Sequence, residues 1–181
     1  IFTTLYNIMK IAITGKMCSG KSTLAQIIRE NDNKYVIYSI GQKVKDVAKE
    51  IFDMKDKDRT LLTSIGSKMR EIDSEVWINY VIKQTENKSH CIIDDLRYQN
   101  EYETLVKNGF KIIQLHISED LQEKRIKEVY PNNYNDHLDN RKHLSEQNNF
   151  KWLEEDNPLV INSGEETIFA IQQKVSSFIN E

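Results

Sequence analysis

A glycine-rich segment, GKMCSGKST at residues 15–23, limits what this chain can fold into more than any other feature. It fits the pattern G-x-x-x-x-G-K-[ST], follows an apolar run at 10–14 and opens a helical stretch at 21–31. Gly15 and Gly20 allow a tight turn that directs backbone N–H groups to a phosphate, and a helix N-terminus favours the same negative charge. The sequence therefore predicts a phosphate loop between a buried strand and a helix.

The side chains of this loop predict a nucleotide and its metal ion as ligands. Lys21 is expected to neutralise the β- and γ-phosphates of ATP, and Ser22 to hold Mg²⁺. Lys16, Ser19 and Thr23 complete the expected donor-binding set with the two glycines. Cys18 occupies a variable position of the pattern, which predicts a small loop residue rather than a nucleophile.

Five apolar runs of strand length recur along the chain, with helical stretches between them. Such runs are typical of strands buried on both faces, and their alternation with helices predicts an α/β fold with a five-stranded parallel sheet in three layers. A length of 181 residues with 39% hydrophobic residues fits one domain over 1–181. The expected strands are 10–14, 35–39, 91–94, 111–117 and 158–162; the expected helices are 21–31, 42–52, 58–72, 74–87, 99–108, 119–129 and 165–179.

Two segments exceed a minimal alternating scheme. Residues 40–90 hold far more chain than the dozen or so residues that a crossover needs, which predicts a helical substrate-binding insert between strands two and three. Residues 129–150 are crowded with Asn and Asp and have almost no apolar periodicity, which predicts an exposed loop or short lid.

Composition excludes several classes of protein. The formal charge is only -3, which argues against a nucleic-acid-coating protein. No apolar stretch approaches the roughly 20 residues that span a bilayer, so no membrane partner is expected. The two cysteines, Cys18 and Cys91, cannot form a disulfide framework, which predicts a reducing, cytoplasmic compartment. Met9 is a plausible alternative start, with residues 1–8 as a dispensable leader.

Two classes of phosphate-loop protein do not fit. A GTPase needs N-K-x-D, whereas the Asn-Lys pair at 87–88 continues with Ser and His. An AAA-type motor needs more chain and an oligomer-facing arginine. A small phosphotransferase fits, and it needs arginines to clamp a second phosphate. Arg97 follows Asp94 and Asp95 at the carboxyl end of a strand; one carboxylate would orient Mg²⁺ and the other would cap a helix or position an arginine.

Four separated pieces of the sequence resemble the deoxynucleoside monophosphate kinases of the bacteriophage type. The resemblance runs from about Met9 to the C-terminus, and its second and third pieces are the specific ones. The pieces are GKMCSGKST; LLTSIGSKMREIDSEVW, with Gly66, Arg70, Asp73 and Trp77; IIDDLRYQNE, with Asp95, Arg97, Asn100 and Glu101; and VINSG.

This resemblance implies a role for most of the polar residues outside the loop. It makes Lys21, Arg70, Arg97 and Arg125 the catalytic set. Arg70 and Arg97 would hold the acceptor monophosphate, and Arg125 and Arg141 would be donor-side lid arginines. Asn162, Ser163 and Gly164 would line the adenine, with a plain strand-to-helix turn as the alternative. The insert would line the slot for the base with Tyr38, Gln42 and Trp77, although core packing is the favoured interpretation of Trp77, and Asp95 completes the acceptor site. Glu101 would brace Arg97 or start a helix. The implied cofactors are ATP and Mg²⁺, the partners small nucleotides, and the assembly a monomer or homodimer.

Other readings share the same loop. The animal phosphomevalonate kinases also resemble this chain, through a strand that ends in Asp-x-Arg and a late Ser-Glu such as Ser145-Glu146, and the dephospho-coenzyme A kinases share the layout. A sensor that binds ATP without transfer belongs to a different class. The segment around Arg70 favours nucleotides as acceptors.

Overall fold

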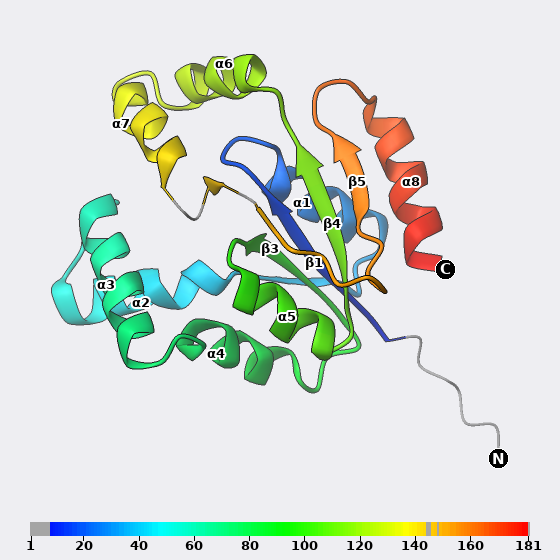
Figure 1. Cartoon of the computed structure of the whole chain (residues 1–181), viewed down its shortest axis with the longest axis horizontal. Helices are drawn as coiled ribbons and strands as arrows, with labels where there is room; N and C mark the ends of the chain where they lie inside the picture. Colours follow the sequence, from blue (N-terminus) through cyan, green and yellow to red (C-terminus); the bar gives the residue numbers. More distant parts are fainter. Residues whose placement is uncertain (1–7, 144–145, 148, 181) are drawn as a thin grey trace.

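A five-stranded sheet, in which every strand runs parallel to its neighbours, forms the centre of the protein (Figure 1). The computed structural model describes residues 8–143, 146–147 and 149–180. The order β2-β3-β1-β4-β5 places the first strand in the middle. The strands are β1 (Met9–Gly15), β2 (Val36–Tyr38), β3 (His90–Leu96), β4 (Phe110–His116) and β5 (Leu159–Asn162).

Helices cover both faces of the sheet, which confirms the predicted three-layer α/β fold. The helices are α1 (Lys21–Asn31), α2 (Ile40–Phe52), α3 (Arg59–Ile72), α4 (Val76–Thr85), α5 (Gln99–Lys107), α6 (Glu119–Val129), α7 (Tyr134–Asp139), η1 (Asn140–Lys142) and α8 (Ile168–Asn180). None of those within the described residues is long and apolar enough to cross a membrane.

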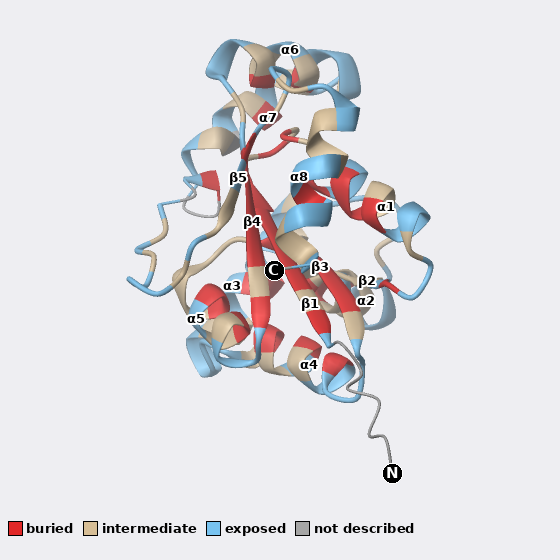
Figure 2. Cartoon of the chain, turned by 90° about the vertical axis from the view of Figure 1, so that its right-hand side faces the viewer, coloured by how far each residue is buried: buried red, intermediate tan, exposed pale blue. Residues whose placement is uncertain are grey.

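The core consists of two clusters, one on each face of the sheet. Ile11 and Ile13 of β1 pack with α1 and α8, whereas Ala12 between them packs with α2, α4 and α5. All three residues are fully buried. Both faces of the central strands are therefore dry, as the unbroken apolar runs predicted, and Figure 2 shows the strands as a buried layer between helices.

Residues 40–90 form the predicted helical insert, α2, α3 and α4, between β2 and β3. The segment 129–150 differs from an open loop because it contains α7 and η1. The Tyr130 and His137 rings stack at a centroid distance of 3.6 Å, and His137 is 1% exposed. A local aromatic stack thus orders a segment that lacks apolar periodicity. The expected leader, 1–8, lies outside the described residues except for Ile8.

Candidate active site

The phosphate loop joins the end of β1 to the start of α1 at the carboxyl edge of the sheet (Figure 1). Gly15 and Gly20 have φ values of 154° and 99°, which favour glycine. A Cβ at Gly15 would lie 2.6 Å from the Ser19 hydroxyl and 2.8 Å from the carbonyl oxygen of Leu115 in β4. The loop can therefore pass this close to β4 only with glycine at position 15.

Side chains from α6 and from the turn after β5 hold three consecutive carbonyl groups of the loop from outside. A trans peptide directs its C=O and N–H in opposite directions, so the N–H groups of Cys18 and Gly20 point away from these side chains. The loop is thereby fixed in a shape that turns backbone donors toward one site. The three pairs are Gln122 Nε2 with the oxygen of Met17 (3.0 Å), Arg125 Nη1 with that of Cys18 (3.1 Å) and Ser163 Oγ with that of Ser19 (2.6 Å).

The start of α1 supplies further backbone donors. Gly20 is its N-cap residue, and no side chain among the described residues caps the helix. Leu24 is the first residue whose N–H bonds to the oxygen of Gly20, at 2.9 Å. The N–H groups of Lys21, Ser22 and Thr23 therefore have no acceptor within the helix, and they lie at its positive end. Such a terminus suits a phosphate.

Lys21 lies folded over the loop. Its Nζ donates to the carbonyl oxygens of Gly15 at 2.7 Å and Lys16 at 2.9 Å, and the residue is 8% exposed. Burial, together with the positive charge of Arg97, lowers the pKa of Lys21 to about 8. The ammonium group is thus buried beside a second cation. A bound phosphate would offset both its loss of hydration and its repulsion from Arg97.

The structure separates the two carboxylates that the sequence left open. Ser22 Oγ donates to Asp94 Oδ2 at 2.9 Å. Burial and the charge of Asp95 raise the pKa of Asp94 above its usual range. Asp95 instead accepts from the Ser39 hydroxyl and from the N–H groups of Ile40 and Gly41 at 2.6–2.8 Å. Asp95 therefore anchors the start of α2, and Asp94 faces the loop.

The pair of Ser22 and Asp94 fits a magnesium ion. Within the described residues, no group of three or more His, Cys, Asp and Glu side chains is arranged to hold a metal. Magnesium is usually bound by one or two protein oxygens together with substrate phosphates and water. A hydroxyl and a carboxylate 2.9 Å apart beside a phosphate loop meet that requirement.

Glu101 links the side chain of one expected acceptor arginine, Arg70, to the backbone of the other, Arg97. Arg70 Nη2 of the insert pairs with Glu101 Oε1 at 3.0 Å, while Glu101 Oε2 accepts the backbone N–H of Arg97 at 3.0 Å and of Tyr98 at 3.1 Å. The guanidinium of Arg70 also lies 4.3 Å from the centre of the Tyr98 ring. Glu101 thus both starts α5 and braces Arg70, and burial raises its pKa despite this pairing.

The spacing of the insert motif has a local cause. The carbonyl oxygen of Gly66 accepts from Trp77 Nε1 at 3.1 Å and from Arg70 Nη1 at 3.3 Å. Trp77 is 3% exposed and belongs to the core beneath the insert. This geometry agrees with the favoured interpretation of Trp77 as a packing residue: its ring packs the insert, and its N–H donates to Gly66. The motif therefore orients Arg70.

The other acceptor-side candidates lie apart from the loop. Tyr38 at the end of β2 is partly buried against the insert-side core, and burial raises its pKa. Gln42 donates to Asp46 Oδ1 at 2.8 Å along the exposed face of α2. The structure does not join either residue to the arginine cluster, so their contact with a base stays a prediction.

On the donor side, Arg125 lies at the loop and Arg141 does not. Arg125 Nη1 also donates to Ser163 Oγ at 2.8 Å. Gly164 follows, with φ 93°, and a Cβ there would lie 2.2 Å from Leu121 Cδ2. Arg141 faces α6, where its Nη2 lies 3.8 Å from Glu123 Oε2.

Asn162 is exposed at the end of β5, and its backbone N–H donates to Glu166. Adenine contacts by Asn162 and Gly164, and a donor role for Arg141, stay predictions.

Three further charged residues lie near the loop: Arg59 and Lys57, which the sequence did not single out, and Glu146, which it marked only as part of a Ser-Glu pair. Glu146 accepts the N–H of Met17 at 2.6 Å and pairs with Arg97. Arg59 is close enough to influence the Cys18 thiol, whose pKa rises mainly because of burial. Burial, Arg59, Lys45 and Arg97 lower the pKa of Lys57. No spacing signal places these residues at the loop, because the insert tip and the 129–150 segment reach the loop only in three dimensions.

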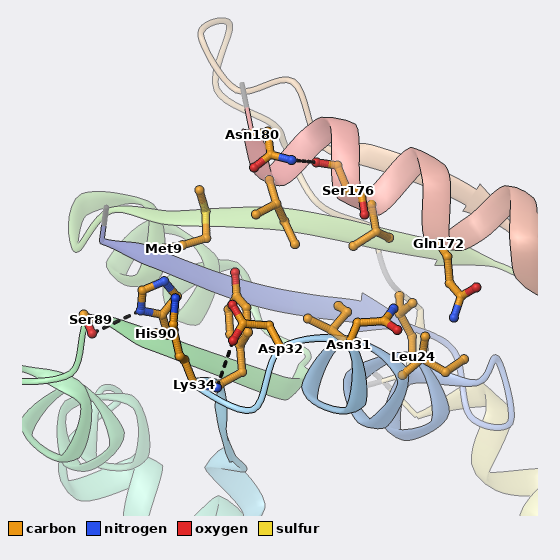
Figure 3. A pocket seen from close by; sticks show the side chains of 15 residues that line it. Met9, Leu24, Asn31, Asp32, Lys34, Ser89, His90, Gln172, Ser176 and Asn180 are labelled. Carbon is orange, nitrogen blue, oxygen red and sulfur yellow. Dashed lines mark hydrogen bonds between the residues drawn. The ribbon is translucent and has the colours of Figure 1, made fainter. Parts of the chain in front are cut away.

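One cavity lies beside this site and another lies far from it. One of about 420 Å³ has Arg97, Tyr98 and Asn100 in its wall, beside the acceptor arginines. Another of about 580 Å³ lies between α1 and α8, where Met9 and His90 begin β1 and β3 (Figure 3). The larger cavity is therefore at the opposite end of the strands from the phosphate loop.

The sequence of this chain matches the model of one protein family. The model of the family described as the AAA domain matches residues 11–147. None of the curated proteins matches the chain in sequence. An AAA-type motor was not expected from a chain of this length, and the similar solved structures below are kinases that the chain covers almost end to end.

Similar solved structures include three kinases. A gluconokinase from Sinorhizobium meliloti has a TM-score of 0.60 at 13% identity, with 96% of this chain and 95% of that chain covered. The APS kinase CysC from Mycobacterium tuberculosis, in complex with AMPPNP and APS, has a TM-score of 0.56 at 11% identity and coverages of 96% and 98%. Shikimate kinase from Bacteroides thetaiotaomicron has a TM-score of 0.51 at 16% identity and coverages of 94% and 95%. These likenesses show the fold.

Proposed function

Because the chain belongs to the AAA domain family and has the fold of P-loop kinases, we propose that it transfers the γ-phosphoryl group of ATP to the phosphate of a deoxynucleoside monophosphate. One observation carries the proposal. Arg70 of the insert pairs with Glu101, which also accepts the backbone N–H of Arg97 at the end of β3, and the charge of the Arg97 guanidinium reaches Lys21. Two arginines next to a phosphate loop suit an acceptor that itself bears a phosphate.

The reaction needs positioning and charge neutralisation rather than a general base. An oxygen of the acceptor phosphate attacks the γ-phosphorus, the bond from that phosphorus to the β-phosphate oxygen breaks, and ADP leaves with the electron pair. The attacking oxygen is already anionic, so no proton has to be removed. Lys21 and the loop N–H groups would hold the donor phosphates, and Arg70 and Arg97 would hold the acceptor in line.

Magnesium would sit at Ser22 and Asp94, where it would screen the charge of the donor phosphates. Asp95 would keep the start of α2, and with it the insert, in register with the loop. The insert, 40–90, would then serve as the monophosphate-binding part of a single kinase domain, and the segment 129–150 as its lid.

The rival proposal is a small-molecule kinase with another acceptor. It is favoured by the names of the similar structures, since a gluconokinase and a shikimate kinase share the fold. The chain also resembles the phosphomevalonate kinases and the dephospho-coenzyme A kinases in sequence. The first resemblance depends partly on the Ser145-Glu146 pair, of which Ser145 lies outside the described residues. A sensor without transfer is the third candidate.

A coupled assay of ADP release separates these candidates. Purified protein with ATP and Mg²⁺ is offered each deoxy- and ribonucleoside monophosphate, and then phosphomevalonate, dephospho-coenzyme A, gluconate and shikimate. We expect transfer to a deoxynucleotide. A ribose hydroxyl that is buried without a hydrogen-bond partner costs about 1–3 kcal/mol. The kcat/KM of the deoxynucleotide should therefore exceed that of the matching ribonucleotide by about 5- to 150-fold. Turnover confined to a non-nucleotide acceptor would overturn the proposal, and turnover with none would favour the sensor.

Arg70→Ala and Arg97→Ala test the acceptor site directly. Each should weaken binding of the monophosphate by about 1.5–3 kcal/mol, the contribution of hydrogen bonds to a charged group, while binding of ATP changes little. Calorimetric titration of both ligands measures this difference, and Arg29→Ala, on α1, is the matched control. Equal losses for the two ligands would assign these arginines to the donor side.

A further inference from the structure

Glu146 is a buried carboxylate between two parts of the proposed phosphoryl-transfer site. Its Oε2 accepts the backbone N–H of Met17 in the phosphate loop at 2.6 Å, and its Oε1 forms an ion pair with Arg97 Nη1. The residue is 7% exposed. One carboxylate therefore connects the loop that would hold the donor to the arginine that would hold the acceptor.

The surroundings of Glu146 do not suggest a packing role. It comes from a polar segment, and its side chain contacts a backbone N–H and a guanidinium. Burying a carboxylate is costly unless it is paired and hydrogen-bonded, and here both oxygens have such partners. The two groups that compensate for its burial are an acceptor-side guanidinium and a loop amide.

Charge balance around Lys21 explains what this carboxylate adds. Lys21 is buried, and the half-buried Arg97 is close enough to disfavour the charge on Lys21, whereas Glu146, Asp95 and Asp94 favour it. Glu146 contributes the largest share of the attraction that favours the charge on Arg97, ahead of Asp95 and Glu101, and it therefore helps to offset the repulsion between Arg97 and Lys21. Through its ion pair with Arg97, Glu146 keeps that guanidinium near Lys21 despite the repulsion between the two cations.

We infer that Glu146 is a positioning residue, which fixes the guanidinium of Arg97 against the phosphate loop so that acceptor and donor phosphates are held in register. The inference rests on the proposed function and deepens it. Arg97 has five N–H donors, so it can keep Glu146 while other donors bind an acceptor phosphate. The role belongs to a segment whose sequence carries no motif for it.

A double-variant cycle tests the inference. With the acceptor identified by the panel, Glu146→Ala should lower kcat by about 10²-fold, the scale of a misplaced reacting group, and leave the KM for ATP within about twofold. In an Arg97→Ala background, the same change should cost less than about twofold, because the residue through which it acts is gone. Glu146→Gln, which keeps one acceptor oxygen and loses the charge, should lie between Ala and wild type. Glu155→Ala, at an exposed glutamate of the same region, should match wild type.

The outcomes distinguish failure of this inference from failure of the proposed function. Wild-type turnover on the acceptor panel decides the function. Equal losses from Glu146→Ala with and without Arg97 would overturn the positioning role, and a gain in kcat would show that Glu146 obstructs the site. The unfolding temperatures of the four proteins test the pair without any turnover: the double variant should lose less than the two single losses together, and additive losses would overturn the contact.

Discussion

At the scale of single residues, Lys21 separates binding chemistry from folding. Its ammonium bonds only to loop carbonyls in the described contacts, and the shape of the loop is held by other side chains. Lys21→Ala should therefore leave the fold intact and lower kcat by about 10³-fold or more, the effect of losing a key phosphate-stabilising charge. Steady-state turnover and circular dichroism measure the two effects, with exposed Lys107→Ala as control. More than about a tenth of wild-type turnover would contradict a catalytic role.

The two neighbouring aspartates should give opposite results. Asp94→Ala removes a buried carboxylate that Asp95 repels, so the free energy of unfolding should not fall, while Mg²⁺-dependent turnover is lost. Asp95→Ala removes the acceptor of two N–H groups at the start of α2, which should lower the free energy of unfolding by about 1–3 kcal/mol. Urea unfolding and turnover of both variants measure this pattern. If Asp94→Ala were the more destabilised protein, the assignment of the two roles would be reversed.

Residues with a fixed spacing in the sequence could be predicted, and those without one could not. Gly15, Gly20 and Lys21 follow from a local pattern, because a short loop and the helix after it fix their positions. Asp94 and Asp95 were found as a pair, but which one faces Ser22 depends on how each side chain leaves β3. Glu146 is 129 residues from the Met17 N–H that it accepts, so the local Ser-Glu pair could not show that it lies at the loop.

At the scale of elements, the stack of Tyr130 on His137 should make the stability of the α7 region depend on pH. Burial, with the charges of Arg59 and Lys57, lowers the pKa of His137 below its ordinary 6.5. The unfolded chain therefore takes up a proton near pH 6.5 where the folded chain does not. The stabilising contribution is complete above pH 6.5 and is lost as the pH falls toward the folded pKa, by about 1.4 kcal/mol per tenfold difference in proton affinity.

His137→Phe keeps a ring on Tyr130 and removes this titration. Urea unfolding between pH 5 and 8 should show a smaller loss of stability at low pH in the variant than in wild type. The same substitution at exposed His116 is the control and should leave the wild-type pH dependence in place. Parallel curves for His137→Phe and wild type would mean that His137 does not titrate with folding.

Helices and strands with a strong apolar period could be predicted, whereas α7 could not. The sheet strands are buried on both faces, and that burial shows in the sequence as unbroken apolar runs. By contrast, α7 is six residues long and is ordered by one stacked pair and the cation of Arg59, 5.8 Å from the Tyr130 ring. It packs against α6 and η1 and against the ring of Tyr130, and apolar periodicity does not encode these contacts.

At the scale of the whole molecule, the strand order explains why distant residues share one site. With β1 central and paired to both β3 and β4, the loop after β1 lies between the end of β3, which carries Asp94 and Arg97, and α6, which carries Arg125. Alternating strands and helices predicted the parallel sheet, but the order of its strands depends on packing that no single segment records. The donor and acceptor sides therefore meet only in the folded chain.

This arrangement predicts separate responses of the whole protein to its two ligands. A ligand present at 100 times its Kd stabilises the folded state by about 2.7 kcal/mol, and for a domain of this size each kcal/mol raises Tm by about 2–4 °C, so a shift of about 5–10 °C is expected. A non-hydrolysable ATP analogue with Mg²⁺ should raise the Tm of wild type and Arg97→Ala alike, but that of Lys21→Ala much less. A deoxynucleoside monophosphate should raise the Tm of wild type and Lys21→Ala but not of Arg97→Ala. Thermal scans of these proteins, with Lys107→Ala as control, measure this. If one variant lost both shifts, donor and acceptor would not have separate sites.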